Sequence, residues 1–220
     1  MRAATQVAIV GTSGRGDDGP RMTKQLFDLM VTRAQAIIRD KLDSSPVHLV
    51  SGGAAWAGCV ENLLRAHSPP VVLNGICLFL DHVAVALFFL EDVYLTLHLP
   101  CGWDHTKEQF IDKGTFDWRT NPGRSLNRYH RQFTSKTGYK SLRDIHLALA
   151  VGACAKIHSG FHQQNAAVAN ADVLIAFSWS TEGYPIVGGT ADTWRKCKSR
   201  KKIHVNLNDL AAECAGSGDE

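Results

Sequence analysis

The sequence predicts an α/β protein with a three-layer Rossmann-like fold, in which a mainly parallel sheet of about five strands lies between two layers of helices. Two observations lead to this fold class. Short apolar runs alternate along the chain with segments of helical periodicity, and each run ends at a loop of small or polar residues. The runs are apolar throughout, which is typical of strands that helices cover on both faces.

The first half of the chain begins with a strand, a glycine-rich loop and a helix. Gln6 to Val10 is a β-branched apolar run, the loop GTSGRG follows, and apolar residues recur at helical spacing from Thr23 to Ile38. Val47 to Val50 predicts the second strand, and Val93 to Leu99 predicts the third. The loops after these strands should meet at one edge of a parallel sheet.

The second half predicts two more strands and the helices between them. The strands are Asp172 to Trp179 and Ile203 to Leu207, and the helical segments cover about 141–157, 160–170 and 190–200. We therefore expect one domain over residues 1–214. Residues 215–220 are small or acidic and are expected to form a disordered tail.

Two stretches, 58–80 and 104–140, are longer than the usual βα connection of about 2 to 6 residues. The second is rich in Arg, Asn, His, Lys and aromatic residues, and it follows the third strand. We interpret residues 104–140 as a lid over the functional site.

Composition and charge exclude several classes of function. The 24 Lys and Arg against 21 Asp and Glu give a net charge of +3, too small to predict binding to duplex nucleic acid. No apolar run reaches the roughly 18 to 20 residues of a membrane span. The six cysteines contain no C-x-x-C pair, and the first residues do not resemble a signal peptide. We expect reduced thiols and a cytoplasmic protein.

Three glycine-containing loops are the main candidates for ligand binding. Glycine lets a ligand approach the backbone closely, and amides at a helix N-terminus favour an anion. No complete G-x-G-x-x-G or P-loop motif is present, so no dinucleotide or other cofactor is expected. The candidate ligand-binding residues in these loops are Gly11, Thr12, Ser13, Gly52, Gly53, Ala54, Gly188, Gly189 and Thr190.

Other side chains have two interpretations each. Arg124 and Arg128, with Arg131, recur at near-helical spacing and suit a phosphate ligand, but a solvated helix face explains them equally well. Trp56 and Trp179 lie beside glycine loops, where they could stack on a base or pack in the core. The histidines within strands (His48, His98 and His204) are interpreted as packed residues. His105 and His130 show no metal-binding spacing, and no metal is expected.

The strand ends carry motifs of a known superfamily. They are VAIVG ending at Gly11, LVSGGA ending at Ala54, Asn165 ahead of ADVLIAF, and GGTAD ending at Asp192. In this order they resemble the SLOG superfamily, which includes YspA-type proteins, the DNA-processing protein A family and the LOG phosphoribohydrolases. The resemblance implies a Rossmann-like fold whose glycine loops hold a nucleotide or a nucleotide-derived ligand. It adds Asn165 to the ligand-binding residues.

The sequence departs from this superfamily at two places. When Gly189-Thr190 is aligned with the G-T of the LOG motif P-G-G-x-G-T-x-x-E, Thr193 takes the place of the glutamate. Outside this motif, Gln164 takes the place of the arginine expected just before Asn165. Asp192, one residue early, is the remaining candidate catalytic carboxylate. YspA-like chains pass from the second glycine loop almost directly into a helix that begins with Asp, as Asp81 does here. Residues 58–80 therefore resemble an insertion, either an extra helix and strand or sequence introduced by altered gene processing.

Three functions stay open at this point. The first is binding or sensing of a small nucleotide-like ligand without catalysis, in which Asp192 or Asn165 contacts the sugar or base. The second is an N-glycosidase of nucleoside phosphates that uses Asp192, or a carboxylate between Asp104 and Asp117, as base or nucleophile. The third is binding of single-stranded DNA through the segment from Arg124 to Arg131, with Tyr129 and Phe133 for stacking. Homo-oligomer formation is left open, and we favour the first function.

Overall fold

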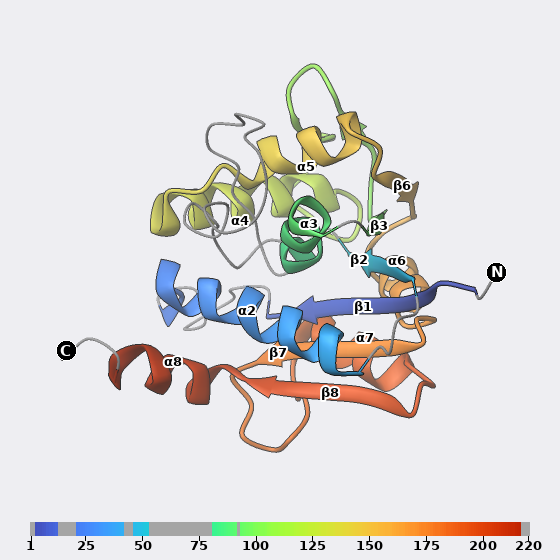
Figure 1. Cartoon of the computed structure of the whole chain (residues 1–220). Coiled ribbons are helices and arrows are strands. Elements are labelled where there is room, and N and C mark those ends of the chain that lie inside the picture. The colour runs from blue at the N-terminus through green and yellow to red at the C-terminus, as the bar shows by residue number, and fades with distance from the viewer. Residues whose placement is uncertain (1–2, 13–20, 42–45, 53–80, 92, 217–220) are drawn as a thin grey trace, which may run out of the picture.

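The computed structural model describes residues 3–12, 21–41, 46–52, 81–91 and 93–216. They form a three-layer α/β fold around a parallel sheet of six strands in the order β6-β3-β2-β1-β7-β8 (Figure 1). The Rossmann-like fold class is confirmed. The strands are β1 (Thr5–Gly11), β2 (Val47–Ser51), β3 (Tyr94–Leu99), β6 (Cys154–Ile157), β7 (Val173–Ser178) and β8 (Lys201–Asn206).

Helices cover the two faces of the sheet because alternate residues of a strand point to opposite sides. Val7 and Ile9 of β1 belong to the larger core cluster, and Ala8 and Val10 belong to the smaller one. In Figure 1, α2 lies in front of the sheet and α7 lies behind it. The larger cluster packs under α2 (Lys24–Lys41), α3 (Asp81–Leu90) and α8 (Leu207–Gly216), and the smaller under α6 (Phe161–Val168) and α7 (Gly188–Lys196).

The segment 141–157, predicted as one helix, contains the sixth strand. The helix α5 (Ser141–Ala150) ends before Gly152, whose φ of 119° no longer continues a helix. β6 then pairs in parallel with β3 at the edge of the sheet. The single-helix prediction is wrong here because β6 is an edge strand of only four residues (CAKI) that Lys156 interrupts, so no continuous apolar run marks it.

The segment 104–140 folds partly into the core. A two-stranded antiparallel hairpin, β4 (Trp103–Asp104) and β5 (Gln109–Phe110), is followed by the helix α4 (Pro122–Thr137). Phe110 and Phe133 are fully buried. Part of the segment interpreted as a lid is therefore packed, whereas residues 111–120 are exposed, and Phe133 is not available to stack on a nucleic acid base.

Several other predictions concern the ends, the insertion and the thiols. α8 includes Ala215 and Gly216, which the sequence placed in a disordered tail. Residues 217–220 and the insertion 58–80 lie outside the described residues. In the described part of the chain no helix is both long and apolar enough to cross a membrane. Its cysteines are free thiols (Cys101, Cys154, Cys197 and Cys214).

Candidate functional site

A cavity of about 290 Å³ lies at the carboxyl ends of the central strands. In the sheet, β1 lies between β2 and β7. The chain builds the sheet outward from β1 through β2 on one side and returns to β7 on the other, so the strand order reverses at β1. Ligands of open α/β sheets bind in the crevice at such a switch point. The cavity is lined by Val10, Gly11, Gly52, Trp118, Leu126, Tyr129, Phe161, His162, Gln164, Asn165, Val168, Gly188, Gly189, Thr190, Asp192, Thr193 and Arg195.

The N-terminus of α7 forms one wall of the cavity. The helix begins with Gly188, Gly189 and Thr190, and its N-cap residue, Val187, makes no side-chain hydrogen bond to the first amides. Gly188 has a φ of 73°, a conformation that favours glycine. The Thr190 hydroxyl donates to the carbonyl of Gly11 and so ties the helix to the end of β1. First-turn amides and the helix dipole make this wall suited to an anion.

Asp192 is the centre of a polar cluster between α6 and α7. Its Oδ2 accepts hydrogen bonds from Asn165 Nδ2 at 2.9 Å and from Lys196 Nζ at 2.6 Å. His162 Nδ1 lies 3.8 Å from the same oxygen. Partial burial raises the pKa of Asp192, but the hydrogen bonds from Lys196 and Asn165, with the charges of Lys196 and His162, bring it below the ordinary value. The carboxylate is therefore ionised at neutral pH, and among the described residues no hydrogen bond reaches Oδ1.

Gln164 connects the second glycine loop to α6. Its amide nitrogen donates to the carbonyl of Gly52, which follows β2. Only 3% of Gln164 is exposed, and within the described residues its Oε1 has no hydrogen-bond partner. The neutral amide thus holds Gly52 beside α6.

Aromatic side chains form another part of the cavity wall. Trp118 comes from the loop before α4, Tyr129 from α4 and Phe161 from the start of α6. The Trp118 and Phe161 rings lie 6.1 Å apart between centroids at 49°. Asn121, which is 1% exposed, accepts hydrogen bonds from the amides of Lys113 and Arg124 and so fixes the loop that carries Trp118.

Most of the candidate ligand-binding residues predicted from the sequence line this cavity. Among the described candidates, Thr12, Arg124 and Arg128 do not. Thr12 lines a smaller neighbouring cavity of about 220 Å³, which also includes Trp179 and the start of α7. Arg124 donates to the carbonyl of Gly114 at 2.9 Å, and Arg128 lies outside the cavity lining. Ser13, Gly53, Ala54 and Trp56 lie outside the described residues. Those in the cavity are Gly11, Gly52, Asn165, Gly188, Gly189, Thr190 and Asp192.

Sequence reasoning missed Arg195, His162 and most of the aromatic residues of the cavity. Arg195 and His162 reach it from α7 and α6, one turn away from predicted residues. Their helical spacing from Asp192 and Asn165, three residues in each case, is the signal that could have found them. No local pattern marks Trp118, because its position depends on the folded loop.

The carboxylates between Asp104 and Asp117 act locally rather than in the cavity. Asp104 Oδ1 accepts the amides of Thr106 and Lys107, and Asp117 Oδ1 accepts the amide of Arg119. Asp112 Oδ1 accepts the amide of Gly114 at 2.8 Å. None of these three carboxylates lines the cavity, so Asp192 is the carboxylate that the described structure brings to the candidate site.

The histidines predicted to be packed residues are hydrogen-bonded, which confirms that interpretation. The ring contacts are His48 with Thr96 at 2.9 Å, His98 with His158 at 2.8 Å and His204 with Ser178 at 2.9 Å. His130 is fully buried and contacts the Ser141 hydroxyl at 2.9 Å. Within the described ranges no three His, Cys, Asp or Glu side chains form a group that could hold a metal ion.

Comparison with known proteins finds a relative in a giant virus. The chain is 31% identical over 208 residues to "Uncharacterized protein R261" of Acanthamoeba polyphaga mimivirus. The match covers 92% of this chain and 96% of the viral protein. No protein-family model matches the chain, and no solved structure matches it significantly.

Proposed function

We propose that this chain, which belongs to the same family as the mimivirus protein, binds a mononucleotide or a similar nucleotide-derived ligand at the carboxyl ends of β1, β2 and β7. One observation carries the proposal. A single cavity combines the first-turn amides of α7, which the N-cap residue Val187 does not cap, with a carboxylate that is ionised at neutral pH and an aromatic wall. These three elements match the phosphate, the sugar hydroxyls and the base of a nucleotide.

The phosphate is assigned to the N-terminus of α7. Gly188 and Gly189 have no side chains to keep an anion from the backbone amides, and a Cβ added at Gly189 would lie 3.6 Å from Asn165 Nδ2. Arg195 lines the same cavity and adds a cationic donor, and the His162 ring adds a second polar group. These features favour an anionic group over a neutral one at this end of the cavity.

The sugar and base are assigned to the remaining walls. Asp192 Oδ1 is available to accept a hydrogen bond from a ribose hydroxyl, because the cluster contacts use Oδ2. Trp118, Tyr129 and Phe161 supply apolar surface for a planar base. The volume of about 290 Å³ lies near the lower end of typical ligand sites, which are about 300–1,000 Å³. This size favours one nucleotide over a dinucleotide.

A thermal-shift and calorimetry panel tests the proposal. The panel contains nucleoside monophosphates, the matching nucleosides, inorganic phosphate and dinucleotides. Ligand at 100 times its dissociation constant stabilises the folded protein by about 2.7 kcal/mol. We expect a nucleoside monophosphate to bind more tightly than its nucleoside or phosphate alone. If no nucleotide binds at concentrations that saturate ordinary nucleotide sites, the proposal is wrong.

Hydrolysis of an N-glycosidic bond is the second candidate, favoured by the ionised Asp192 in the cavity. In that reaction water adds across the bond between base and ribose, which gives the free base and ribose phosphate. Asp192 would act as nucleophile or base. Its contact with Lys196 at 2.6 Å lowers its basicity, which favours binding over catalysis. Chromatography of nucleoside monophosphates after incubation separates the two functions, because only the enzyme releases free base.

A further inference from the structure

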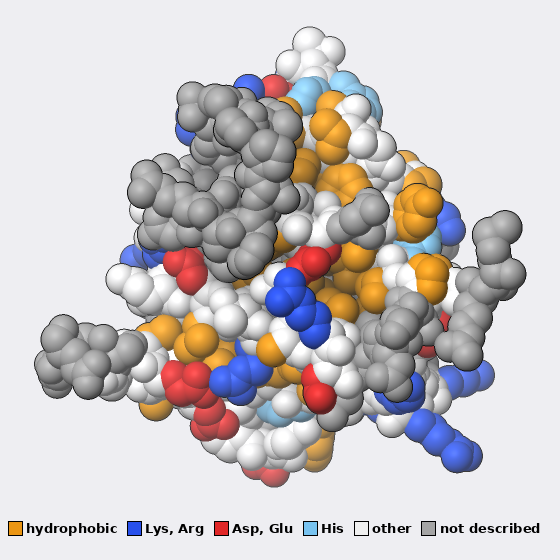
Figure 2. Space-filling model, in the orientation of Figure 1, with side chains coloured by type: hydrophobic (Ala, Val, Ile, Leu, Met, Phe, Trp, Pro, Cys, Tyr) orange, Lys and Arg blue, Asp and Glu red, His pale blue; other side chains and the backbone are white. Residues whose placement is uncertain are grey.

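The turn between α7 and β8, together with the end of α7 and the start of β8, carries a concentration of positive charge that the candidate site uses only in part. Six of the eight residues in 195–202 (RKCKSRKK) are Lys or Arg. The turn precedes β8 and so lies at the amino ends of the strands, away from the glycine loops. Figure 2 shows Lys and Arg side chains that project from this side of the molecule, where β8 begins in Figure 1.

Two of these cations stabilise the fold itself. Lys196 forms the ion pair with Asp192. Lys202 Nζ donates to the carbonyls of Trp194 and Cys197, both at 3.3 Å, at the C-terminal end of α7. Its charge also lies 5.1 Å from the centroid of the Trp194 ring. These contacts account for Lys196 and Lys202, and Arg195 lines the cavity.

The other three cations, Lys198, Arg200 and Lys201, are exposed. Within the described residues none of them forms an ion pair, whereas arginines elsewhere pair with acids, as Arg33 does with Glu213 at 3.0 Å. The neighbouring acid is Asp172. Its carboxylate accepts the amide of Gln6 at 2.9 Å, and its carbonyl accepts the Ser199 hydroxyl at 2.5 Å. Three like charges on one short turn repel one another, and an external polyanion would relieve that repulsion.

We propose that Lys198, Arg200 and Lys201 bind the phosphate backbone of a nucleic acid. The phosphates of a nucleic acid need cationic donors alone, whereas stable binding to an anionic membrane needs apolar insertion or a lipid chain as well. The turn supplies cations and no exposed large apolar side chain. It also presents no exposed aromatic ring, so it contacts the backbone without reading bases, and single and double strands both fit.

The small net charge of the chain does not contradict this surface. Acidic side chains elsewhere in the chain balance the count to +3, and the acid beside the turn, Asp172, accepts a hydrogen bond from the Gln6 amide. Phosphate binding responds to the charges within a Debye length, about 8–10 Å at physiological salt, and not to the sum over the chain. The net charge of +3 therefore does not argue against duplex nucleic acid at this local cluster.

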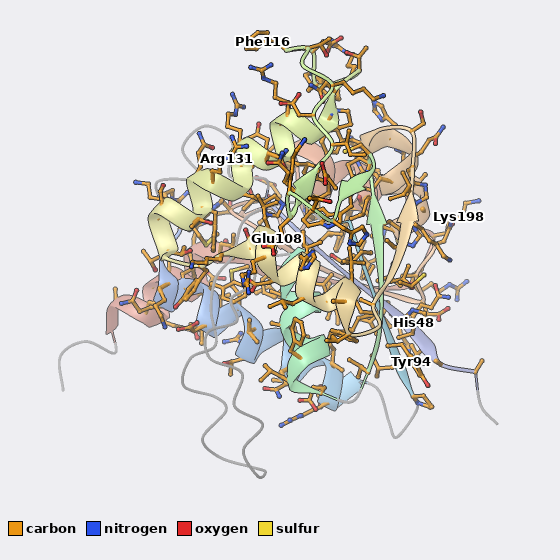
Figure 3. The ribbon with its side chains drawn as sticks, turned by 90° about the horizontal axis from the view of Figure 1, so that it is seen from above. His48, Tyr94, Glu108, Phe116, Arg131 and Lys198 are labelled. Atoms are coloured by element: carbon orange, nitrogen blue, oxygen red, sulfur yellow. The ribbon has the colours of Figure 1, made fainter. Side chains whose placement is uncertain are left out.

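Two triple variants of the full chain test the proposal. The first is Lys198→Gln with Arg200→Gln and Lys201→Gln. The control is Lys113→Gln with Lys136→Gln and Lys140→Gln, three exposed cations outside the segment from Arg124 to Arg131, which removes the same charge. Figure 3 shows Lys198 on a different side of the molecule from Arg131, which marks the helix α4 that carries Lys136. Circular dichroism and thermal melting check that both variants fold, and neither variant alters a residue that lines the cavity.

Fluorescence anisotropy measures binding of labelled single- and double-stranded DNA of mixed sequence at 50 to 200 mM KCl. Each phosphate contact contributes about 0.9 to the slope of log affinity against log salt for B-DNA, so losing three should lower the slope by about 2.7. Over this fourfold salt range, wild-type affinity should fall about 40-fold more than that of the turn variant. The control should keep the wild-type slope.

Three outcomes would overturn the inference. If the wild-type protein binds no DNA at 50 mM KCl, the inference is wrong. If both variants lose the same amount of DNA affinity, the binding depends on net charge alone. Binding of the wild type to phosphatidylserine vesicles but not to DNA would assign the turn to a membrane instead. Because the turn variant leaves the cavity intact, mononucleotide binding can fail or succeed independently of each of these results.

Discussion

Hydrogen bonds from Lys196 and Asn165 stabilise the ionised form of Asp192. We therefore expect its replacement to change ligand affinity more than protein stability. The Asp192→Asn variant should weaken nucleotide binding by about 1 to 3 kcal/mol, because the ligand loses a charged acceptor. Its effect on stability should be small, about 0 to 1 kcal/mol, since the ion pair with Lys196 is partly exposed. Calorimetry and thermal melting measure the two effects.

A matched control is Asp209→Asn, which changes an exposed carboxylate in the first turn of α8. It should leave nucleotide affinity unchanged. Unchanged affinity in Asp192→Asn together with a lower melting temperature would show that Asp192 is only a structural residue of α7.

The lowered pKa of the buried His98 predicts that the free energy of unfolding depends on pH. Burial lowers the pKa of His98 to about 4, and the charges of His158 and Lys156 act in the same direction. The unfolded chain takes up this proton near pH 6.5, while the folded protein resists it until about pH 4. The contribution of His98 to stability is therefore fully present above pH 6.5 and is lost as the pH falls towards 4.

Denaturant unfolding between pH 7 and pH 4 checks this expectation. The free energy of unfolding should fall over the range, and it should fall less in His98→Gln, which lacks the titrating ring. The exposed His105 provides the control. If His105→Gln flattened the profile as much as His98→Gln, the buried ring would not be its source.

At the scale of elements, the N-terminus of α7 is the feature that the candidate site depends on. Gly189 has an ordinary backbone, and a Cβ there would lie 3.6 Å from Asn165 Nδ2, an ordinary contact. Gly189→Ala should therefore fold normally. Gly189→Val should also fold, but its branched side chain should abolish nucleotide binding because it keeps the anion from the amides.

Calorimetry of the two variants, with circular dichroism, measures this difference. The alanine variant serves as the control for the loss of glycine itself. If the valine variant bound nucleotide as the wild type does, the glycine loop would be a turn without a role in the ligand site.

At the scale of the whole molecule, the sequence predicts that residues 58–80 can be removed. The strand, loop and helix pattern closes when Ala57 joins Asp81, where α3 begins. α3 contributes Val83 to Leu87 to the core, so the deletion variant retains the packed helix. We expect a folded protein whose stability equals or exceeds that of the full chain.

Denaturant unfolding of both proteins decides the matter. The deleted stretch is rich in Leu, Val and Ile, and if it packed against the domain, its removal would expose apolar surface at about 25 cal/mol per Å². A lower unfolding midpoint for the deletion variant would therefore contradict the prediction and make residues 58–80 part of the native core.

The sequence by itself determined the course of the main chain through most of the sheet and the position of the glycine loops. Strands such as Val7 to Val10 and Val173 to Phe177 are buried on both faces, so burial requires a continuous apolar run that is visible in the sequence. In a parallel sheet the loops after such strands must share one edge. The meeting of Gly11, Gly52 and Gly188 in one cavity follows from these two facts.

Only the tertiary structure decided which side chains complete the site and where the sheet ends. β6 is a strand because β3 offers it a partner, and its exposed side chains carry no pattern of their own. Trp118 reaches the cavity because the buried Asn121 holds its loop, whereas Arg124 is bound to the carbonyl of Gly114 outside the cavity. The direction of a side chain in an irregular segment depends on contacts with residues distant in sequence, and local periodicity does not record these contacts.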